Sequence, residues 1–228
     1  MDLGGRPALA FMLARLARCE TLTRVGVATS DLAQDDCIAG LCDALSVGIF
    51  RGSEKDVLSR YVAAAEMFRA DVVVRLTADC PFICPEVTDL VVRAYRDASP
   101  SVDYATNCLR RTYPQGLDTE VISRDALERS ALEATEAADR EHVTYFVWRQ
   151  RERFRHLSVE DGENHSDLRW TVDTPEDYRL ISLMVKALGE RAVTSTYHEL
   201  LDVFARHPEW AQINALVEQH KPCVSGFA

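Results

Sequence analysis

Short apolar runs alternate with longer segments of helical periodicity over the first hundred residues. The runs "RVGVATS", "VGIFRGS" and "DVVVRLT" are rich in β-branched side chains and read as buried strands. Between and around them, apolar side chains recur every three to four positions, which predicts the helices "PALAFMLARLARC", "DDCIAGLCDAL", "DVLSRYVAAAEMF" and "PEVTDLVVRAYRDA". Such alternation is typical of βαβ units, so we expect a mostly parallel sheet.

After residue 100 the pattern changes. "VDYATN" and "DTEVIS" predict two strands joined by the loop "CLRRTYPQG", and two helices follow. "FRHLSVE" and "LRWTVD" predict two more strands, as a possible antiparallel addition. "PEDYRLISLMVKAL" predicts a helix that begins at Pro175, and the last stretch predicts two helices interrupted at Pro208. We therefore expect one α/β domain over residues 1–228, with residues 190–228 as its helical extension.

Composition narrows the function classes. The chain has 228 residues and a net charge of −10, and a phosphate backbone favours a basic surface, which argues against nucleic-acid binding as the main activity. No apolar run approaches the ~18 residues of a membrane span, and no signal peptide is visible. Seven cysteines without framework spacing suggest reduced thiols and a cytoplasmic protein.

Two carboxylates stand where predicted strands end. Asp79 follows "DVVVRLT", and Asp173 follows the apolar pair Trp170 and Val172. Ligands of open α/β sheets bind at the carboxyl ends of the strands, so the two side chains could meet across a crevice. Paired carboxylates suit Mg²⁺, which takes its remaining ligands from water and phosphates. The alternative is that each aspartate caps the helix that follows it.

Six motifs occur in a fixed order along the chain: "VGVATSDLAQDD", "IFRGSEKDVLSRY", "VVRLTADCPFICPEV", "TYPQGLDTEV", "REHVTYFVWR" and "LRWTVDTPEDYRLI". Together they resemble the cytidylyltransferases of the SpsF (spore coat polysaccharide) type, relatives of the CMP-Kdo and CMP-sialic acid synthetases. The resemblance runs from about Leu3 to the end. It implies a Rossmann-like nucleotide-diphospho-sugar transferase fold, three-layer α/β/α. The implied reaction moves CMP from CTP to a sugar, with an acidic sugar expected, and releases pyrophosphate for surface polysaccharide synthesis.

The resemblance also implies roles for individual residues. Asp79 and Asp173 match the metal-binding carboxylates, and Arg75, inside a buried strand, needs a carboxylate or phosphate partner. The expected nucleotide-binding residues are Gly52, Ser53, Asp56 and Ala78. The expected sugar-binding residues are Asn107, Gln115, Asp118, Glu120 and His142. Plainer interpretations stay open: a simple tight turn at Gly52–Ser53, a surface ion pair between Asp56 and Arg60, and an incidental histidine at a helix start.

The amino-terminal stretch departs from this family. Members begin with a strand and a loop of the form A-R-x-x-S-x-R-L-P-x-K, whose amides and basic side chains hold the triphosphate. This sequence begins at "MDLGGRPALAFML", which normally follows that loop. We expect the natural form to be longer, and the chain as written to bind CTP weakly and release little pyrophosphate. A non-catalytic sugar- or nucleotide-binding remnant and a sugar-1-phosphate nucleotidyltransferase remain as alternatives.

The carboxyl-terminal segment carries more apolar side chains than a small exposed helix needs. "YHELLDVF" and "WAQINALV" both show this excess. Apolar patches of this kind often mark association surfaces, so we expect residues 196–220 to help form a homodimer. Packing of these helices on their own sheet is the alternative.

Overall fold

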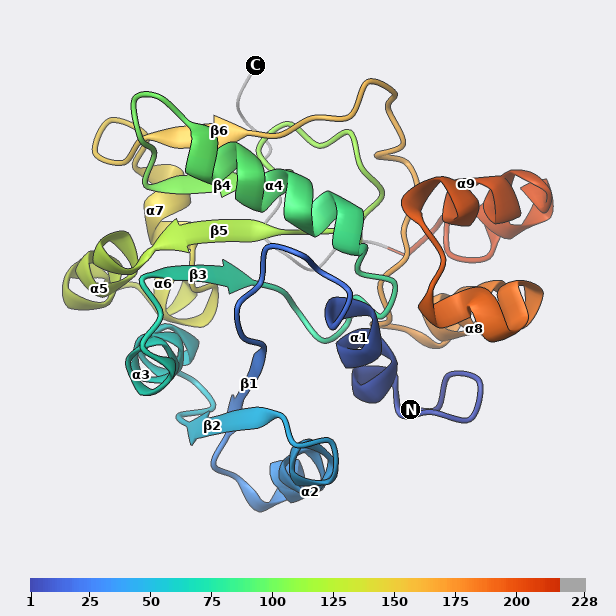
Figure 1. The fold of residues 1–228 in the computed structure, drawn as a ribbon, viewed down its shortest axis with the longest axis horizontal. Coiled ribbons are helices and arrows are strands. Elements are labelled where there is room, and N and C mark those ends of the chain that lie inside the picture. Colours follow the sequence, from blue (N-terminus) through green and yellow to red (C-terminus); the bar gives the residue numbers. More distant parts are fainter. Residues whose placement is uncertain (218–228) are drawn as a thin grey trace.

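The computed structural model describes residues 1–217 as an α/β structure with helices on both sides of a sheet (Figure 1). The strands are β1 (Gly26–Ser30), β2 (Gly48–Gly52), β3 (Val72–Arg75), β4 (Tyr104–Thr106), β5 (Glu120–Ser123) and β6 (His156–Ser158). The helices are α1 (Ala8–Leu16), α2 (Asp36–Ala44), α3 (Val57–Phe68), α4 (Pro85–Asp97), α5 (Arg124–Glu133), α6 (Ala137–Glu141), α7 (Tyr145–Arg149), α8 (Pro175–Leu188) and α9 (Tyr197–Ala205). Short 3₁₀ turns add η1 (Ala33–Asp35), η2 (Gly189–Val193) and η3 (Pro208–Gln212).

Local sequence signals account for where several helices begin. Pro85 occupies the first turn of α4, where its missing N–H costs no hydrogen bond. Helices α8 and α9 each start with a capping box, made by Thr174 with Asp177 and by Thr196 with Glu199. These signals determine the residues at which the two carboxyl-terminal helices begin.

The strands form two separate sheets within the described residues. β3, β5, β4 and β6 make a four-stranded sheet in that order, and β1 pairs with β2 in parallel. β5 is antiparallel to both β3 and β4, whereas β6 is parallel to β4. The expected mixed α/β architecture is therefore confirmed, but the antiparallel strand is β5, and β6 is not an antiparallel addition.

Helices cover both faces of the four-stranded sheet. Val91 and Val92 of α4 pack against Ala105 and Val121 on one face, and Figure 1 shows α4 lying across it. On the other face, helices α3, α5 and α7 pack around Tyr104 and Ile122. Successive residues of β4 and β5 thus point to opposite cores, as the pleat of a strand requires.

The carboxyl-terminal helices share a core with α1. The large buried side chains of this core are Phe11, Phe82, Trp170, Leu200, Phe204 and Trp210. The apolar residues of α9 that suggested a homodimer are thus buried within their own chain, against α8 and the loop side chains Tyr113 and Trp170 rather than the sheet. The homodimer stays a prediction without that support, and residues 218–220 of the segment lie outside the described residues.

A buried arginine ties α1 to this carboxyl-terminal unit. Arg15 is fully buried and donates to Ile83 O (2.8 Å), to Ala192 O (2.8 Å) and to both the hydroxyl (3.0 Å) and carbonyl (2.9 Å) of Ser195. Burial lowers the pKa of its guanidinium to about 10. The carbonyls that Arg15 binds would otherwise be buried without a partner, so the contact holds three distant segments together.

The expected strand "LRWTVD" does not form. Trp170 N–H donates to Gln115 O (2.7 Å), and Val172 N–H donates to Asp79 O (2.8 Å). Because neighbouring amides bond to two different segments, no ladder develops, and only an isolated bridge between Gln115 and Arg169 remains. None of the helices within residues 1–217 has the length and apolarity needed to cross a membrane.

Candidate active site

Most of the residues selected from the sequence gather on one edge of the four-stranded sheet. Arg75 pairs in register with Glu120, and Thr106 pairs with both Glu120 and Ser158. These positions are the carboxyl ends of β3, β4 and β6 and the amino end of the reversed strand β5. The loops that follow carry Asp79, Asn107 and the segment 111–118 to the same edge, where α/β sheets bind ligands.

Asp79 and Asp173 lie on adjacent segments at this edge. The hydrogen bond from Val172 N–H to Asp79 O joins the loop after β3 to the turn before α8. Asp79 is half-buried, and the Asp173 side chain is 45% exposed. The two carboxylates expected to share an ion are therefore close in the fold and reachable from solvent.

Neither aspartate caps a helix, which removes the plainer interpretation. The N-cap of α4 is Cys84, five positions beyond Asp79, and the N-cap of α8 is Thr174. Asp177 satisfies the backbone of that cap, because it accepts from the N–H groups of both Asp173 and Thr174. The carboxylates of Asp79 and Asp173 are thus not needed by the helices that follow them.

Arg169 was not selected from the sequence, yet it organises this turn. Its guanidinium pairs with Asp173 (2.6 Å) and with the buried Asp177 (2.9 Å), while Asn214 donates to the same Asp177 carboxylate (2.8 Å). Burial opposes ionisation of Asp177, but these hydrogen bonds hold its pKa below the ordinary value. The signal in the sequence was the i, i+4 spacing of Arg169 and Asp173, which is common on helices but here spans a turn.

Arg75 and Glu120 form a buried ion pair beneath the edge. Their side chains are 19% and 13% exposed, and Glu120 also accepts from the hydroxyls of Tyr104 (2.5 Å) and Thr144. Burial raises the pKa of Glu120, but Arg75 and the two hydroxyls outweigh it and hold the carboxyl ionised. Arg75 thus has the carboxylate partner that its buried position required, and the oxygens of Glu120 are bound within the protein.

The loop between β4 and β5 is fixed by side-chain bonds to its own backbone. Asn107 is buried, donates to Leu117 O (2.8 Å) and accepts from Thr119 N–H (2.9 Å). The Arg111 guanidinium donates two hydrogen bonds, of 2.6 and 2.9 Å, to the Asp118 carboxylate. Asn107 and Asp118 thus support the loop in this structure, and the sugar-binding role expected for Asn107, Asp118 and Glu120 stays a prediction.

Gln115 differs from these supports. Its backbone bonds to the segment 168–170, but its side-chain amide has no hydrogen-bond partner among residues 1–217. The next residue, Gly116, has φ +104°, and a Cβ there would lie 2.7 Å from the Trp170 backbone. The close crossing that Gly116 permits brings Gln115 next to Arg169, four positions before Asp173, and leaves the Gln115 residue 9% exposed.

The expected nucleotide side lies at the end of β2. Ser53 accepts from Asp56 N–H (3.0 Å) and, through its carbonyl, from Arg60 (3.0 Å), so the Gly52–Ser53 turn is closed by α3. The proposed ion pair between Asp56 and Arg60 is wrong, because Asp56 caps α3 and pairs with Arg140. The Gly52 backbone needs no positive φ, so the turn does not require glycine for its conformation.

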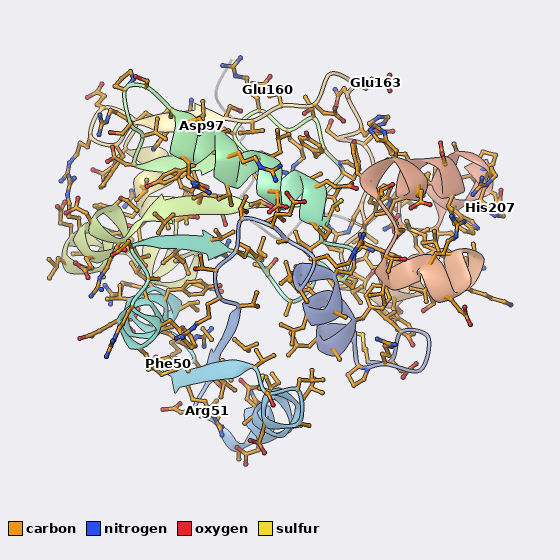
Figure 2. The ribbon with its side chains drawn as sticks, in the orientation of Figure 1. Phe50, Arg51, Asp97, Glu160, Glu163 and His207 are labelled. Atoms are coloured by element: carbon orange, nitrogen blue, oxygen red, sulfur yellow. The ribbon has the colours of Figure 1, made fainter. Side chains whose placement is uncertain are left out.

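His142 lies after a helix end rather than at a helix start. It follows α6 and faces Tyr145, and together with the exposed Ala78 it lines a cavity next to β3. His207, in contrast, stacks on Trp210 at the outer end of the carboxyl-terminal unit (Figure 2). Of these two histidines, His142 is therefore the one placed beside the candidate site.

A divalent cation at this edge would depend on the carboxylates of Asp79 and Asp173. Among residues 1–217, no three His, Cys, Asp or Glu side chains lie close enough together to hold one ion. Mg²⁺ requires fewer protein ligands, because one or two carboxylates suffice when water and substrate phosphates complete its octahedron. Asp79 and Asp173 fit that requirement.

The fold and the polar edge define the class of protein as a nucleotidyltransferase. A cytidylyltransferase structure from Leptospira borgpetersenii superposes with a TM-score of 0.87 at 29% identity, covering 93% of this chain and 88% of that one. A CMP:2-keto-3-deoxy-manno-octonic acid synthetase structure complexed with CTP shares the fold, with a TM-score of 0.59 at 16% identity over 82% of this chain and 90% of that one.

The chain belongs to the cytidylyltransferase family, whose model it matches over residues 1–221. The spore coat polysaccharide biosynthesis protein SpsF of Bacillus subtilis is 34% identical over 188 residues, 81% of this chain and 76% of SpsF. An uncharacterized protein of Methanocaldococcus jannaschii is 32% identical over 221 residues, 96% of this chain and 88% of its own length. The resemblance to the SpsF type is thereby confirmed.

Proposed function

We propose that the protein transfers CMP from CTP to a hydroxyl of a sugar, with an acidic sugar as the acceptor, for surface polysaccharide synthesis. The observation that carries this proposal is the meeting of Asp79 and the Asp173 turn at the carboxyl edge of a cytidylyltransferase sheet. Support also comes from the relatives, since one is a polysaccharide biosynthesis protein and another structure contains CTP.

The chain's own residues account for binding and alignment. The sugar hydroxyl loses its proton to solvent and its oxygen bonds to the α-phosphorus of CTP, while the bond from that phosphorus to the bridging oxygen breaks and pyrophosphate leaves. Asp79 and Asp173 would hold Mg²⁺, which when bound neutralises polyphosphate charge that a protein of net charge −10 would otherwise repel. The Gly52–Ser53 turn and Ala78 flank the nucleotide, and Gln115 offers its amide to the sugar.

A second candidate is a nucleotide- or sugar-binding protein without turnover. The division of the sheet between β1 and β3 favours it, because the two halves of the crevice are then not held by one continuous sheet. Both candidates predict CTP binding, and only the first predicts pyrophosphate release.

Pyrophosphate release and CTP binding are the measurements that separate the candidates. The 228-residue chain is incubated with CTP and Mg²⁺ and with acidic sugars, neutral sugars or sugar 1-phosphates, and released pyrophosphate and CTP affinity are recorded. Asp79→Asn and Asp173→Asn are compared with Asp202→Asn, whose side chain is exposed on α9 away from the edge.

The expected result is that an acidic sugar supports release, and that the two edge variants lower kcat at least ~100-fold while Asp202→Asn does not. CTP binding without release for any sugar would select the binding protein. Release with sugar 1-phosphates alone would select the sugar-1-phosphate enzyme. Equal activity in all three variants would contradict the assignment of the site.

A further inference from the structure

A chain of hydrogen bonds runs from Asn214, which follows η3, to the candidate metal ligand Asp173. Asn214 is buried, and its side-chain amide donates to Asp177 Oδ1 (2.8 Å) and to the carbonyl oxygen of Arg169 (3.0 Å). The Arg169 guanidinium donates to both oxygens of Asp177 (2.9 and 3.0 Å) and to Asp173 Oδ2 (2.6 Å). We call these four side chains the Asp173 network.

The inner members of the Asp173 network have little freedom to move. Asp177 is fully buried, and its carboxylate also accepts from the backbone N–H groups of Asp173 and Thr174. The Arg169 side chain is 10% exposed. A two-point contact between a guanidinium and a carboxylate fixes the relative orientation of both groups. The direction from which Arg169 reaches Asp173 is therefore set by Asp177 and, behind it, by Asn214.

The two carboxylate oxygens of Asp173 are in different situations. Oδ2 accepts from Arg169, whereas Oδ1 has no hydrogen-bond partner among residues 1–217, and the side chain is 45% exposed. Ca²⁺ binds carboxylates through one oxygen or through both, but the smaller Mg²⁺ requires a near-octahedral set of single oxygens. The contact with Arg169 thus blocks a two-oxygen mode that Ca²⁺ can use and that Mg²⁺ does not need.

We propose that Arg169, held by Asp177 and Asn214, positions Asp173 so that only Oδ1 is offered to a divalent cation, which favours Mg²⁺ over Ca²⁺. The proposal rests on the proposed function, because it takes Asp79 and Asp173 as the metal ligands. Arg169 and Asn214 are then positioning residues. Since the carboxylate of Asp177 balances the charge of Arg169, the pair acts on a bound cation through the orientation of Asp173. A purely structural role would lower stability without changing which cation binds better.

Cation binding in the absence of turnover tests this proposal on the whole chain. The protein is titrated with Mn²⁺, without CTP or sugar; the free ion is followed by electron paramagnetic resonance, and Mg²⁺ or Ca²⁺ is added as competitor. Arg169→Gln/Asp177→Asn removes the ion pair without changing the net charge, and Asn214→Leu removes only the donors behind it. The matched control is Arg124→Gln/Glu128→Gln, which removes an exposed pair on α5. Circular dichroism verifies that each variant is folded.

The chain is expected to bind Mn²⁺ and to release it to Mg²⁺ more readily than to Ca²⁺. The double network variant should lower Mn²⁺ affinity about 10-fold or more, as loss of a partner of a metal ligand typically does, and Ca²⁺ affinity should fall less. Asn214→Leu should change the ratio of the two affinities in the same direction, and it decides the matter if the double variant does not fold.

Two results would contradict these expectations in different ways. A ratio of Ca²⁺ to Mn²⁺ affinity that is the same in both network variants, the control and the unmodified chain overturns the proposal, while the metal site and the proposed function stand. If the unmodified chain binds no Mn²⁺, or if Asp79→Asn leaves that binding unchanged, the assignment of the metal site is itself wrong.

Discussion

Glu120→Gln tests whether the buried pair with Arg75 holds the floor of the candidate site. Glutamine keeps the shape of the side chain and one acceptor for Tyr104, but it leaves the Arg75 guanidinium without a counter-charge. Breaking a buried pair by neutralising one partner costs about 3–5 kcal/mol. The pair is 19% and 13% exposed, so the lower end of that range, about 3 kcal/mol, is expected.

Urea unfolding followed by circular dichroism measures this loss. A chain of this size has an m-value near the upper end of the usual range, about 3 kcal/mol/M, so the midpoint should fall by about 1 M with m unchanged. The matched control is Glu128→Gln, which breaks the exposed i, i+4 pair with Arg124 and should cost under about 0.5 kcal/mol. A midpoint shift for Glu120→Gln no larger than that of the control would refute the buried-pair reasoning.

Four further outcomes are expected. Asp118→Ala, which releases Arg111 and loosens the loop, should raise KM for the sugar more than for CTP in initial-rate assays; equal effects would count against a sugar-side loop. The pKa values of Glu120 and Asp177 lie below their ordinary values of 4.5 and 3.8, so the ionised carboxylates stabilise the folded state at neutral pH. This stabilisation is lost as the pH falls below about 4.5. Tm measured from pH 3 to 6 should therefore drop in that range, and less steeply in Glu120→Gln. Thr174→Ala should cost about 1 kcal/mol by removing the α8 cap, as measured by urea unfolding; no loss would show that Asp177 alone caps the helix. Light scattering at micromolar concentration should give a dimer, and a monomer would contradict that prediction.

Many helices and strands of the fold can be predicted from local patterns of apolar and polar residues. Every helix and strand expected before residue 100 is present, because apolar periodicity and helix-start signals act locally. The prediction of a strand at "LRWTVD" was wrong. Its backbone N–H groups bond to Gln115 and Asp79, which lie on different segments that no local pattern reveals. The edge position of Asp79 and Asp173 was foreseeable, since strand ends meet at one side of a sheet.

The sequence did not show which charged side chains of the site pair with one another. Asp56 pairs with Arg140, 84 positions away, although Arg60 lies one turn along the same helix. Glu120 alternates with Asp118 along the chain, yet its carboxylate is enclosed by Arg75, Tyr104 and Thr144. Both outcomes depend on how helices pack over the sheet, which sets distances that single-sequence patterns do not encode.

The buried Arg15 has a consequence for the order in which this chain can fold during synthesis. Its guanidinium belongs to the first helix, but its acceptor on Ala192 lies 177 residues later. At roughly 5–20 residues per second, a ribosome needs about 10–35 s to supply that acceptor. Until then the Arg15 guanidinium has Ile83 O as an acceptor but lacks its acceptors near residues 192–195, and α1 lacks the part of its core that comes from α8. Nascent chains halted before residue 192 should therefore stay sensitive to protease at α1.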